Sequence, residues 1–317
     1  MSVPLRRGSR AVPLESRAAL AVLDRAIVRL LPTVPRPVVR RIADRYIAGE
    51  ELDDAIATVA RLNAEGKSAT VDVLGEEVRR REEADAIVRA YHDVFEAIRE
   101  DGLESNVSVK PTGLGLKLGY EVARANVETV VRHAAEVRNF VRIDMEDAST
   151  TADTLRLYRE LRELGLDNVG IVLQARLRRT LGDIESLSDL RPNVRICKGI
   201  YLEPDAIAFT GFEEIRGAYV RALEALVESA SYVGIATHDE FLISEGKRVA
   251  RDDRHEFQML LGVRPALGDD LVRAGEKLRI YVPFGRQWYE YSLRRLQENP
   301  RIAGYIAGDT ISRVLSR

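Results

Sequence analysis

Short apolar runs and amphipathic stretches alternate along most of this chain of 317 residues, and this alternation restricts the folds that it can adopt. Eight runs rich in β-branched or other apolar residues follow Lys67, at residues 69–73, 106–109, 140–143, 169–173, 194–196, 232–236, 257–261 and 278–282. Between them lie amphipathic stretches at 77–100, 120–138, 151–164, 214–229 and 266–275, and a shorter helix is expected at 180–187. Strands that alternate with helices are typical of parallel α/β folds. Eight repeats within roughly 250 residues predict a (β/α)8 barrel rather than an open doubly wound sheet.

The glycine pattern also favours the barrel. No G-x-G-x-x-G motif follows the first apolar run, where an open sheet that binds a dinucleotide would need it. The nearest glycine-rich segment, residues 112–115, follows the second run and lacks the third glycine. A dinucleotide-binding fold of the open type is therefore not expected.

The first part of the chain has a different pattern, with helical periodicity and no strand signal. Helices are expected at residues 16–31, 38–48 and 52–64, where proline and glycine residues separate them. This pattern predicts an N-terminal helical segment at 1–66 and a barrel domain at 67–317. The amphipathic start is expected to pack on the barrel or cover it, with a membrane contact or a subunit contact as alternatives.

Composition excludes several classes of protein. The formal net charge of −2 gives no electrostatic reason to expect a nucleic-acid-binding protein. Cys197 is the single cysteine, so an internal disulfide is excluded, and four histidines without repeated spacing argue against a structural zinc site. The most apolar stretch, residues 18–31, is interrupted by Asp24, Arg25 and Arg29 and is too short to span a bilayer.

Polar side chains stand at the ends of several of the apolar runs. They are Lys110, Asp144, Gln174, Lys198, Thr237, His238 and Tyr281. For a single position, a polar residue simply marks where a strand leaves the core. As a set they indicate a site, because the C-terminal ends of barrel strands converge on one mouth.

The sharpest local pattern follows the last apolar run. A helix is expected after Gly285, over the barrel mouth, until Asn299 and Pro300 end it. Helical spacing places four side chains on one face of this helix, namely Tyr291, Arg294, Arg295 and Glu298. Two adjacent guanidinium groups suit a carboxylate or a phosphate, whereas the alternative is a solvated basic face.

Seven motifs, in a fixed order along residues 67–298, resemble those of the proline dehydrogenase family. They are Val-Lys110, Arg-Ile-Asp144, Val-Leu-Gln174, Arg195-Ile-Cys-Lys198-Gly199, Ala-Thr237-His238, Phe-Gln-Met-Leu260 and the segment 281–295. The chain is most similar to the monofunctional bacterial type, since it leaves no room for an aldehyde dehydrogenase domain. One departure is Ile200, which stands where the family often has a small residue.

The resemblance implies a flavin enzyme. Proteins of this family bind FAD non-covalently and oxidise L-proline to Δ1-pyrroline-5-carboxylate, the first step of proline catabolism. A hydride passes to flavin N5, and the electrons then pass to a quinone. On the matching positions, Arg294, Arg295 and Lys110 would bind the substrate carboxylate and Tyr291 would pack against the pyrrolidine ring. Leu260 and Tyr201 would close an apolar wall.

Other matching positions would bind the flavin. Arg195 would approach flavin N5, and Gln174 would hydrogen-bond the edge of the isoalloxazine ring. Positions near the phosphates and the adenosine half match Lys198, Gly199, Thr237 and His238, and a position near the ribityl chain matches Glu298. Asp144 would lie beside the substrate-binding groups and Tyr281, where it would orient them, balance their charge or influence the proton on the amine.

Two alternatives remain open. A Schiff-base aldolase or related lyase would use Lys110 or Lys198 as a barrel lysine. A catalytically silent barrel would bind an amino acid or a partner protein. The resemblance also implies a cytoplasmic protein. It leaves open a peripheral contact with the inner face of the cell membrane, the identity of the quinone and the oligomeric state.

Overall fold

A computed structural model describes residue 40 and residues 43–250, 252–289 and 291–292. Its contacts divide the chain into two units, which are residues 43–288 and the two ends of the chain, 1–42 with 289–317. The first unit contains the barrel. Among the described residues, no helix has the length and apolarity needed to cross a membrane.

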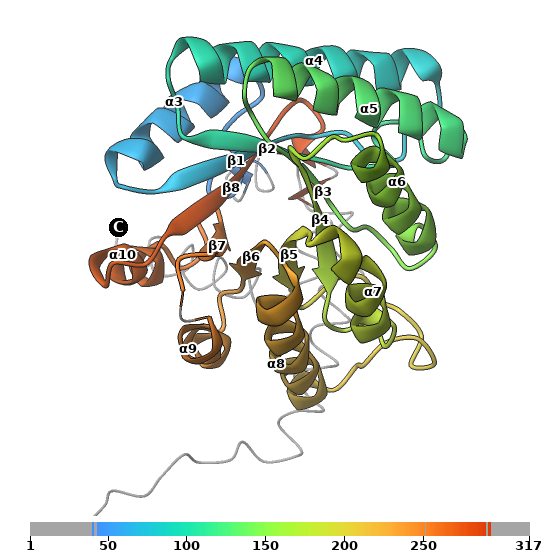
Figure 1. The fold of residues 1–317 in the computed structure, drawn as a ribbon. Helices are drawn as coiled ribbons and strands as arrows, with labels where there is room; N and C mark the ends of the chain where they lie inside the picture. The colour runs from blue at the N-terminus through green and yellow to red at the C-terminus, as the bar shows by residue number, and fades with distance from the viewer. Residues whose placement is uncertain (1–39, 41–42, 251, 290, 293–317) are drawn as a thin grey trace, which may run out of the picture. The chain divides into compact units, whose positions relative to one another are not determined.

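Eight parallel strands form a closed barrel, so the predicted fold class is confirmed (Figure 1). The strands are β1 (Ser68–Val73), β2 (Ser105–Val109), β3 (Val141–Ile143), β4 (Val169–Gln174), β5 (Asn193–Cys197), β6 (Tyr232–Ala236), β7 (His255–Leu260) and β8 (Leu278–Phe284). Each strand pairs with the next along the chain, and β8 pairs with β1 to close the ring. All eight strands lie where the sequence predicts them, within two residues at each end.

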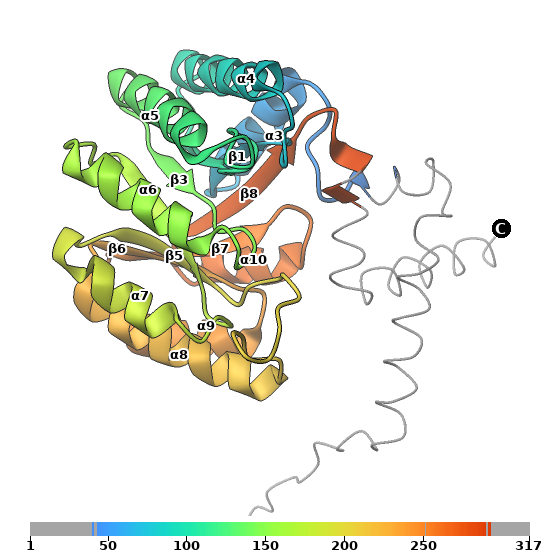
Figure 2. The same ribbon diagram turned by 90° about the vertical axis from the view of Figure 1, so that its right-hand side faces the viewer.

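Helices surround the barrel on its outer side (Figures 1 and 2). They are α3 (Leu52–Ala64), α4 (Arg81–Glu100), α5 (Tyr120–Glu136), α6 (Thr151–Glu163), α7 (Thr180–Leu187), α8 (Phe212–Ser229), α9 (Glu240–Val249) and α10 (Pro265–Arg273). A 3-10 turn, η2 (Ser188–Leu190), follows α7. The helices α4 and α5 run side by side in both views.

Helix α9 is not among the predicted helices. It is short, and Gly246 interrupts its periodicity. Gly246 packs against β7, because a Cβ atom there would lie 3.0 Å from Cε1 of Phe257. Tertiary packing therefore decides this helix, and Asp239 caps it by accepting a hydrogen bond from the Phe241 amide at 3.1 Å.

Two predicted helices near the start of the barrel differ from the structure. The stretch 77–100 becomes helical only at Arg81, and Glu77 has a left-handed φ of +52°. Residues 44–48 of the expected helix 38–48 form a turn and an extended segment. That prediction is wrong for these residues, because the Ala48 amide donates to the carbonyl of Pro283 at the end of β8 instead.

Helix α3 has the predicted bounds and packs against the barrel. Its buried face, formed by Ala55, Val59 and Leu62, belongs to the same hydrophobic core as β1 and β8. The division of the chain at residue 66 stays a prediction. The expected helix 16–31 lies outside the described residues, as does most of the expected final helix, of which residues 288–289 and 291–292 are described and helical.

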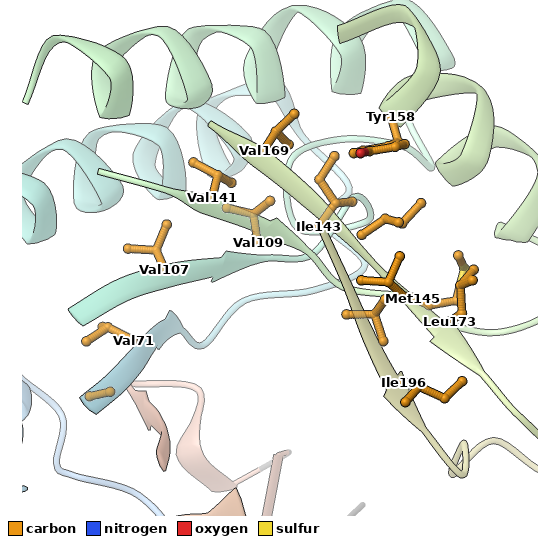
Figure 3. Packing of buried hydrophobic residues seen from close by; sticks show 14 of the residues in the cluster. Val71, Val107, Val109, Val141, Ile143, Met145, Tyr158, Val169, Leu173 and Ile196 are labelled. Carbon is orange, nitrogen blue, oxygen red and sulfur yellow. The ribbon is translucent and has the colours of Figure 1, made fainter. Parts of the chain in front are cut away.

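Side chains alternate along each strand between the helices and the barrel interior. Outward residues such as Val109, Ile143 and Val169 are fully buried, and Figure 3 shows Ile143 and Val169 beside Tyr158 of α6. Most of the hydrophobic core therefore lies between the strands and the surrounding helices, as expected for this fold.

The interior of this barrel is unusually polar, since branched apolar side chains dominate most barrels of this class. Arg142 on β3 donates to the backbone and side-chain oxygens of Asn193 on β5, at 2.6 and 2.5 Å. Glu256 on β7 accepts from Arg279 on β8 at 2.6 Å and from Gln258 at 2.6 Å. Because Arg142 bonds a strand that is not its neighbour, its side chain reaches across the interior of the ring.

We predict that Glu256→Gln destabilises the fold by about 3 kcal/mol at pH 7, because removing one member of a buried ion pair leaves Arg279 uncompensated. Burial would raise the pKa of Glu256, but Arg279 outweighs it and the pKa lies below its usual range. The stabilisation is therefore present above pH ~4.3, the usual pKa of an unfolded glutamate, and is lost as the pH falls through the lower folded value.

Urea unfolding of the wild type and of Glu256→Gln, at pH values from 7 to 3, tests this prediction. The control is Glu224→Gln, which removes a half-exposed partner of Arg248 and should change stability by less than about 1 kcal/mol. Equal losses in the two variants, or a loss from Glu256→Gln that grows as the pH falls, would contradict it.

Candidate active site

A chain of charged and polar side chains crosses the C-terminal mouth of the barrel. Its members come from five different strands and are Asp72, Lys110, Asp144, Arg195 and Tyr281. Asp72, Lys110 and Asp144 lie at the C-terminal ends of their strands or directly after them, where barrel enzymes carry their active sites, and Arg195 and Tyr281 lie at inward positions in the middle of β5 and β8. The structure thus brings together four residues that the sequence predicts and one that it does not.

Lys110 and Asp72 form a buried ion pair at one end of this chain. The Lys110 Nζ atom lies 2.5 Å from Oδ2 of Asp72, whose side chain is fully buried. Burial raises the pKa of Asp72, and the charge of Lys110 partly offsets this effect. The Tyr91 hydroxyl donates to the Ser108 carbonyl at 2.6 Å and approaches Oδ1 of Asp72 at 3.4 Å. A carboxylate at this distance favours the ammonium form of Lys110.

Asp72 was missed because it lies inside the first apolar run rather than at its end. Side chains alternate along a strand, so Asp72, between Val71 and Val73, points to the barrel interior like Thr70. An ionised group at a buried strand position requires a partner. An inward-pointing carboxylate within an apolar strand is the signal that could have identified Asp72.

Asp144 connects the tyrosine and the arginine of the mouth. Tyr281 donates its hydroxyl hydrogen to Oδ2 of Asp144 at 2.8 Å, and Nη1 of Arg195 donates to Oδ1 at 2.8 Å. The Tyr281 hydroxyl also lies 3.4 Å from Nζ of Lys110. The carboxylate of Asp144 therefore holds both side chains and balances part of the positive charge.

Arg195 uses all three of its guanidinium nitrogens within the barrel. Besides Asp144, it donates to Oγ of Ser108 at 3.1 Å and to Oε1 of Gln258 at 2.5 Å. Its guanidinium lies 5.3 Å from the centre of the Tyr281 ring. Partners on β2 and β7 and just after β3 fix the position of this cation.

A second group of residues surrounds the loops after β4 and β5. The side-chain amide of Gln174 donates to the carbonyls of Met145 and Glu146, at 3.1 and 2.7 Å, so its nitrogen is already occupied. Gly199 has a left-handed φ of +90°, and a Cβ atom there would lie 2.6 Å from Oε1 of Gln174. Only glycine fits this position without strain.

Lys198 lies in a charged cluster at the N-terminus of α9. Its Nζ lies 2.5 Å from Oδ2 of Asp239, which also accepts two hydrogen bonds from Arg216 at 2.7 and 2.8 Å. Burial would raise the pKa of Asp239, but the hydrogen bonds from Arg216 and Lys198 outweigh it and hold this pKa far below its usual range. Lys198 also lies 4.8 Å from the centre of the Phe212 ring.

Thr237 and His238 connect the ends of β6 and β7. The Thr237 hydroxyl accepts the Asp239 amide at 3.1 Å. The Leu260 amide donates to Nε2 of His238 at 3.0 Å, so this ring nitrogen acts as an acceptor and the Leu260 backbone occupies it. Both side chains thus help to shape the mouth through the backbone.

Glu146 braces two loops of the mouth and is a further residue that was not predicted. It is buried and accepts the amide and the hydroxyl of Thr112, at 2.9 and 2.5 Å. Burial raises the pKa of Glu146 despite these hydrogen bonds. The hydrogen bonds tie the loop after β2, which begins just beyond Lys110, to the loop after β3.

Fewer contacts are described for the remaining predicted residues, and some of these residues lie outside the described part of the chain. Tyr201 is half-buried in the loop after β5, where its carbonyl accepts from Arg176 at 2.5 Å, and Leu260 ends β7. Ile200, the departure from the family pattern, is 39% exposed. Tyr291 is buried and belongs to the unit that contains residues 289–317. Arg294, Arg295 and Glu298 lie outside the described residues.

A closed parallel barrel with paired lysine, aspartate, tyrosine and arginine side chains at its C-terminal mouth is typical of a (β/α)8 enzyme. Comparison with known proteins identifies which one. A profile of the proline dehydrogenase family matches residues 55–307. The chain is 35% identical over 303 residues to the proline dehydrogenase of Deinococcus radiodurans, covering 92% of this chain and 96% of that protein. The chain belongs to the proline dehydrogenase family, which is a family of oxidoreductases.

Two further comparisons agree with this assignment. Proline dehydrogenase 1 of Bacillus subtilis subsp. natto is 35% identical over 269 residues, covering 83% of this chain and 89% of that protein. The crystal structure of proline utilization A from Bdellovibrio bacteriovorus, inactivated by N-propargylglycine, superposes with a TM-score of 0.76 and 24% identity. It covers 82% of this chain, which spans 33% of that longer one, and this likeness concerns the fold alone.

We predict that Asp72→Asn increases the fraction of Lys110 in the neutral amine form, because it removes the carboxylate 2.5 Å away. Reductive methylation requires a neutral amine, so Lys110 should be labelled several-fold faster at pH 8 in the variant than in the wild type. Mass spectrometry of the peptide that contains Lys110 measures the rate. Asp85→Asn, which changes an exposed carboxylate on α4, should leave the rate unchanged. An unchanged rate in Asp72→Asn would refute the coupling.

Proposed function

We propose that this protein is an FAD-dependent proline dehydrogenase that oxidises L-proline to Δ1-pyrroline-5-carboxylate and passes the electrons to a quinone. The observation that carries this proposal is the linked set Lys110, Tyr281, Asp144 and Arg195 at the mouth of a barrel that belongs to this family. The reaction removes a hydride from C5 of the ring and a proton from the amine, and it forms a C=N bond.

Proline offers two charged groups to such a site, a carboxylate and an amine. Lys110, whose Nζ lies 2.5 Å from Oδ2 of Asp72, is proposed to supply positive charge for the carboxylate. Arg294 and Arg295 are proposed to add two guanidinium groups, each able to form two parallel hydrogen bonds. Leu260, Tyr201 and Tyr291 are proposed to contact the apolar ring.

Asp144 and Tyr281 suit the amine end of the substrate. The carboxylate of Asp144 is held by the Tyr281 hydroxyl and by Arg195, so it orients these groups and limits the net positive charge at the mouth. An aspartate and a phenol in contact also provide acceptors for the hydrogen atoms of the amine.

The donor set around β4, β5 and β6 fits a flavin dinucleotide. Arg195 and Lys198 supply positive charge, and glycine at position 199 allows close approach of the backbone. The Nε atom of Arg176, on the neighbouring loop, is buried and has no hydrogen-bond partner among the described residues. Gln174, Thr237, His238 and Glu298 are the other proposed cofactor contacts. The bound flavin would supply the two-electron oxidant for the reaction, and positive charge at Arg195 favours its reduced form.

The Schiff-base alternative is less well supported. A Schiff-base lysine reacts as a neutral amine, yet Lys110 and Lys198 each lie 2.5 Å from a carboxylate.

An absorbance spectrum of the purified protein tests the proposal most directly. We expect the absorbance of an oxidised flavin in the blue part of the visible spectrum. This absorbance should disappear when L-proline is added in the absence of oxygen, because the flavin is then reduced. A colourless protein that borohydride traps with a keto acid would instead establish the lyase. A protein that shows neither of these two responses would support the silent barrel.

We predict that Gly199→Ala lowers the flavin content of the purified protein, because the new methyl group requires a strained backbone and meets Gln174 and Arg176. Gly182→Ala is the control, since a Cβ atom there contacts nothing within 4 Å and alanine suits helix α7. The ratio of flavin to protein measures the effect. Full occupancy in Gly199→Ala would remove this loop from the cofactor site.

We predict that Arg294→Met and Arg295→Met each raise the KM for proline by at least about 10-fold, since losing a charged hydrogen-bond partner costs roughly 1.5–3 kcal/mol. The flavin should remain bound in both variants. Arg132→Met, which changes an exposed arginine on α5, should leave KM unchanged. Wild-type KM values in both variants would exclude the arginine pair from the substrate site.

A further inference from the structure

The N-terminal end of the barrel, opposite the mouth, contains a large cavity. Its volume is about 740 Å³, which lies within the range of small-molecule sites. The loops that lead into β2, β3 and β8 form its rim, at residues 102–105, 137–140 and 277–279. It reaches inward to Tyr232 and Glu256 on the barrel wall. None of the mouth residues lines it.

Cationic side chains outnumber carboxylates in this cavity. Its lining includes Arg99, Arg138, Lys277 and Arg279 against Glu104 and Glu256, and Arg99 also pairs with Glu96, outside the lining, at 2.5 Å. The carboxylate of Glu256 is already engaged by Arg279 and Gln258.

The barrel interior above the cavity adds to this positive potential. Burial lowers the pKa of Arg142 to about 9, and the nearby cations Arg195 and Arg279 contribute to this shift. An anion at the N-terminal end would reduce this repulsion.

Arg138 stands at a position where four other helices of the barrel have glycine. It follows the C-terminus of α5 with a left-handed φ of +56°. The corresponding residues after α3, α4, α6 and α10 are Gly66, Gly102, Gly165 and Gly275, all with positive φ. A side chain in this conformation is strained, and such strain is often retained where the side chain has a function.

The guanidinium of Arg138 also has no salt bridge or hydrogen bond to another described residue, although it lies at the cavity wall. Apolar side chains cover another part of the wall, including Ile98, Leu103 and Phe140. The cavity thus offers an exposed guanidinium beside an apolar surface, which suits a small organic anion.

We propose that this cavity binds a small oxyanion, a phosphate-bearing or carboxylate-bearing molecule, with Arg138 and Lys277 as its main ligands. The site is independent of the proposed dehydrogenase activity, because it lies at the other end of the barrel. The strained Arg138 is the specific recognition element, and the apolar rim accepts the carbon part of the ligand.

Isothermal titration of the full-length protein with inorganic pyrophosphate and with citrate, at constant ionic strength, tests this site. We expect saturable binding of at least one of them. Arg138→Gly should weaken it at least 10-fold and also raise the thermal midpoint, because glycine suits this backbone conformation. Arg191→Gly is the matched control, since Arg191 has a φ of +44° but does not line the cavity. It should raise the midpoint and leave binding within twofold.

The two titrants separate the ligand classes, since binding of pyrophosphate alone indicates a phosphate group and binding of citrate alone indicates carboxylates. Both arginine variants should show wild-type reduction of the flavin by proline. Absence of saturable binding by either titrant would overturn the proposal. Binding that persists unchanged in Arg138→Gly would also overturn it, because the anion would then occupy another place such as the mouth.

Discussion

The arrangement of the barrel interior depends on the hydrogen bonds of the Arg195 guanidinium. From β5 it bonds Ser108 on β2, Gln258 on β7 and Asp144 just after β3, so one side chain links four sides of the ring. A buried cation of this kind must be matched by acceptors on several strands. This requirement explains why inward positions carry serine, glutamine and carboxylate side chains where most barrels have branched apolar ones.

The same constraint organises the mouth. Because Arg195 holds Asp144, the carboxylate can also fix the Tyr281 hydroxyl, which in turn lies near the ammonium of Lys110. Asp72 balances that ammonium from below, where no water reaches it. Positive and negative groups alternate across the mouth, so its cationic side chains are held without a large uncompensated charge. This arrangement agrees with membership of the proline dehydrogenase family.

Much of the fold could be predicted from local patterns, and the failures have local causes too. Short runs rich in apolar and β-branched residues identify all eight strands, because the outward side of each strand is continuously buried. Helix α9 was missed because Gly246 weakens its periodicity, and its packing against Phe257 became visible only in three dimensions. Residues 44–48 were assigned to a helix, although a hydrogen bond from Ala48 to Pro283, far along the chain, decides their conformation.

The sequence by itself determined the barrel, the strand-end residues Lys110, Asp144 and Tyr281, and the family. It could do so because strand ends and ordered motifs are features of local order along the chain. Only the tertiary structure decided which of these residues touch. The pairing of Asp72 with Lys110 joins positions 38 residues apart, and the bond between Arg195 and Gln258 joins positions 63 apart. Such contacts depend on the closure and register of the ring, which no local pattern records.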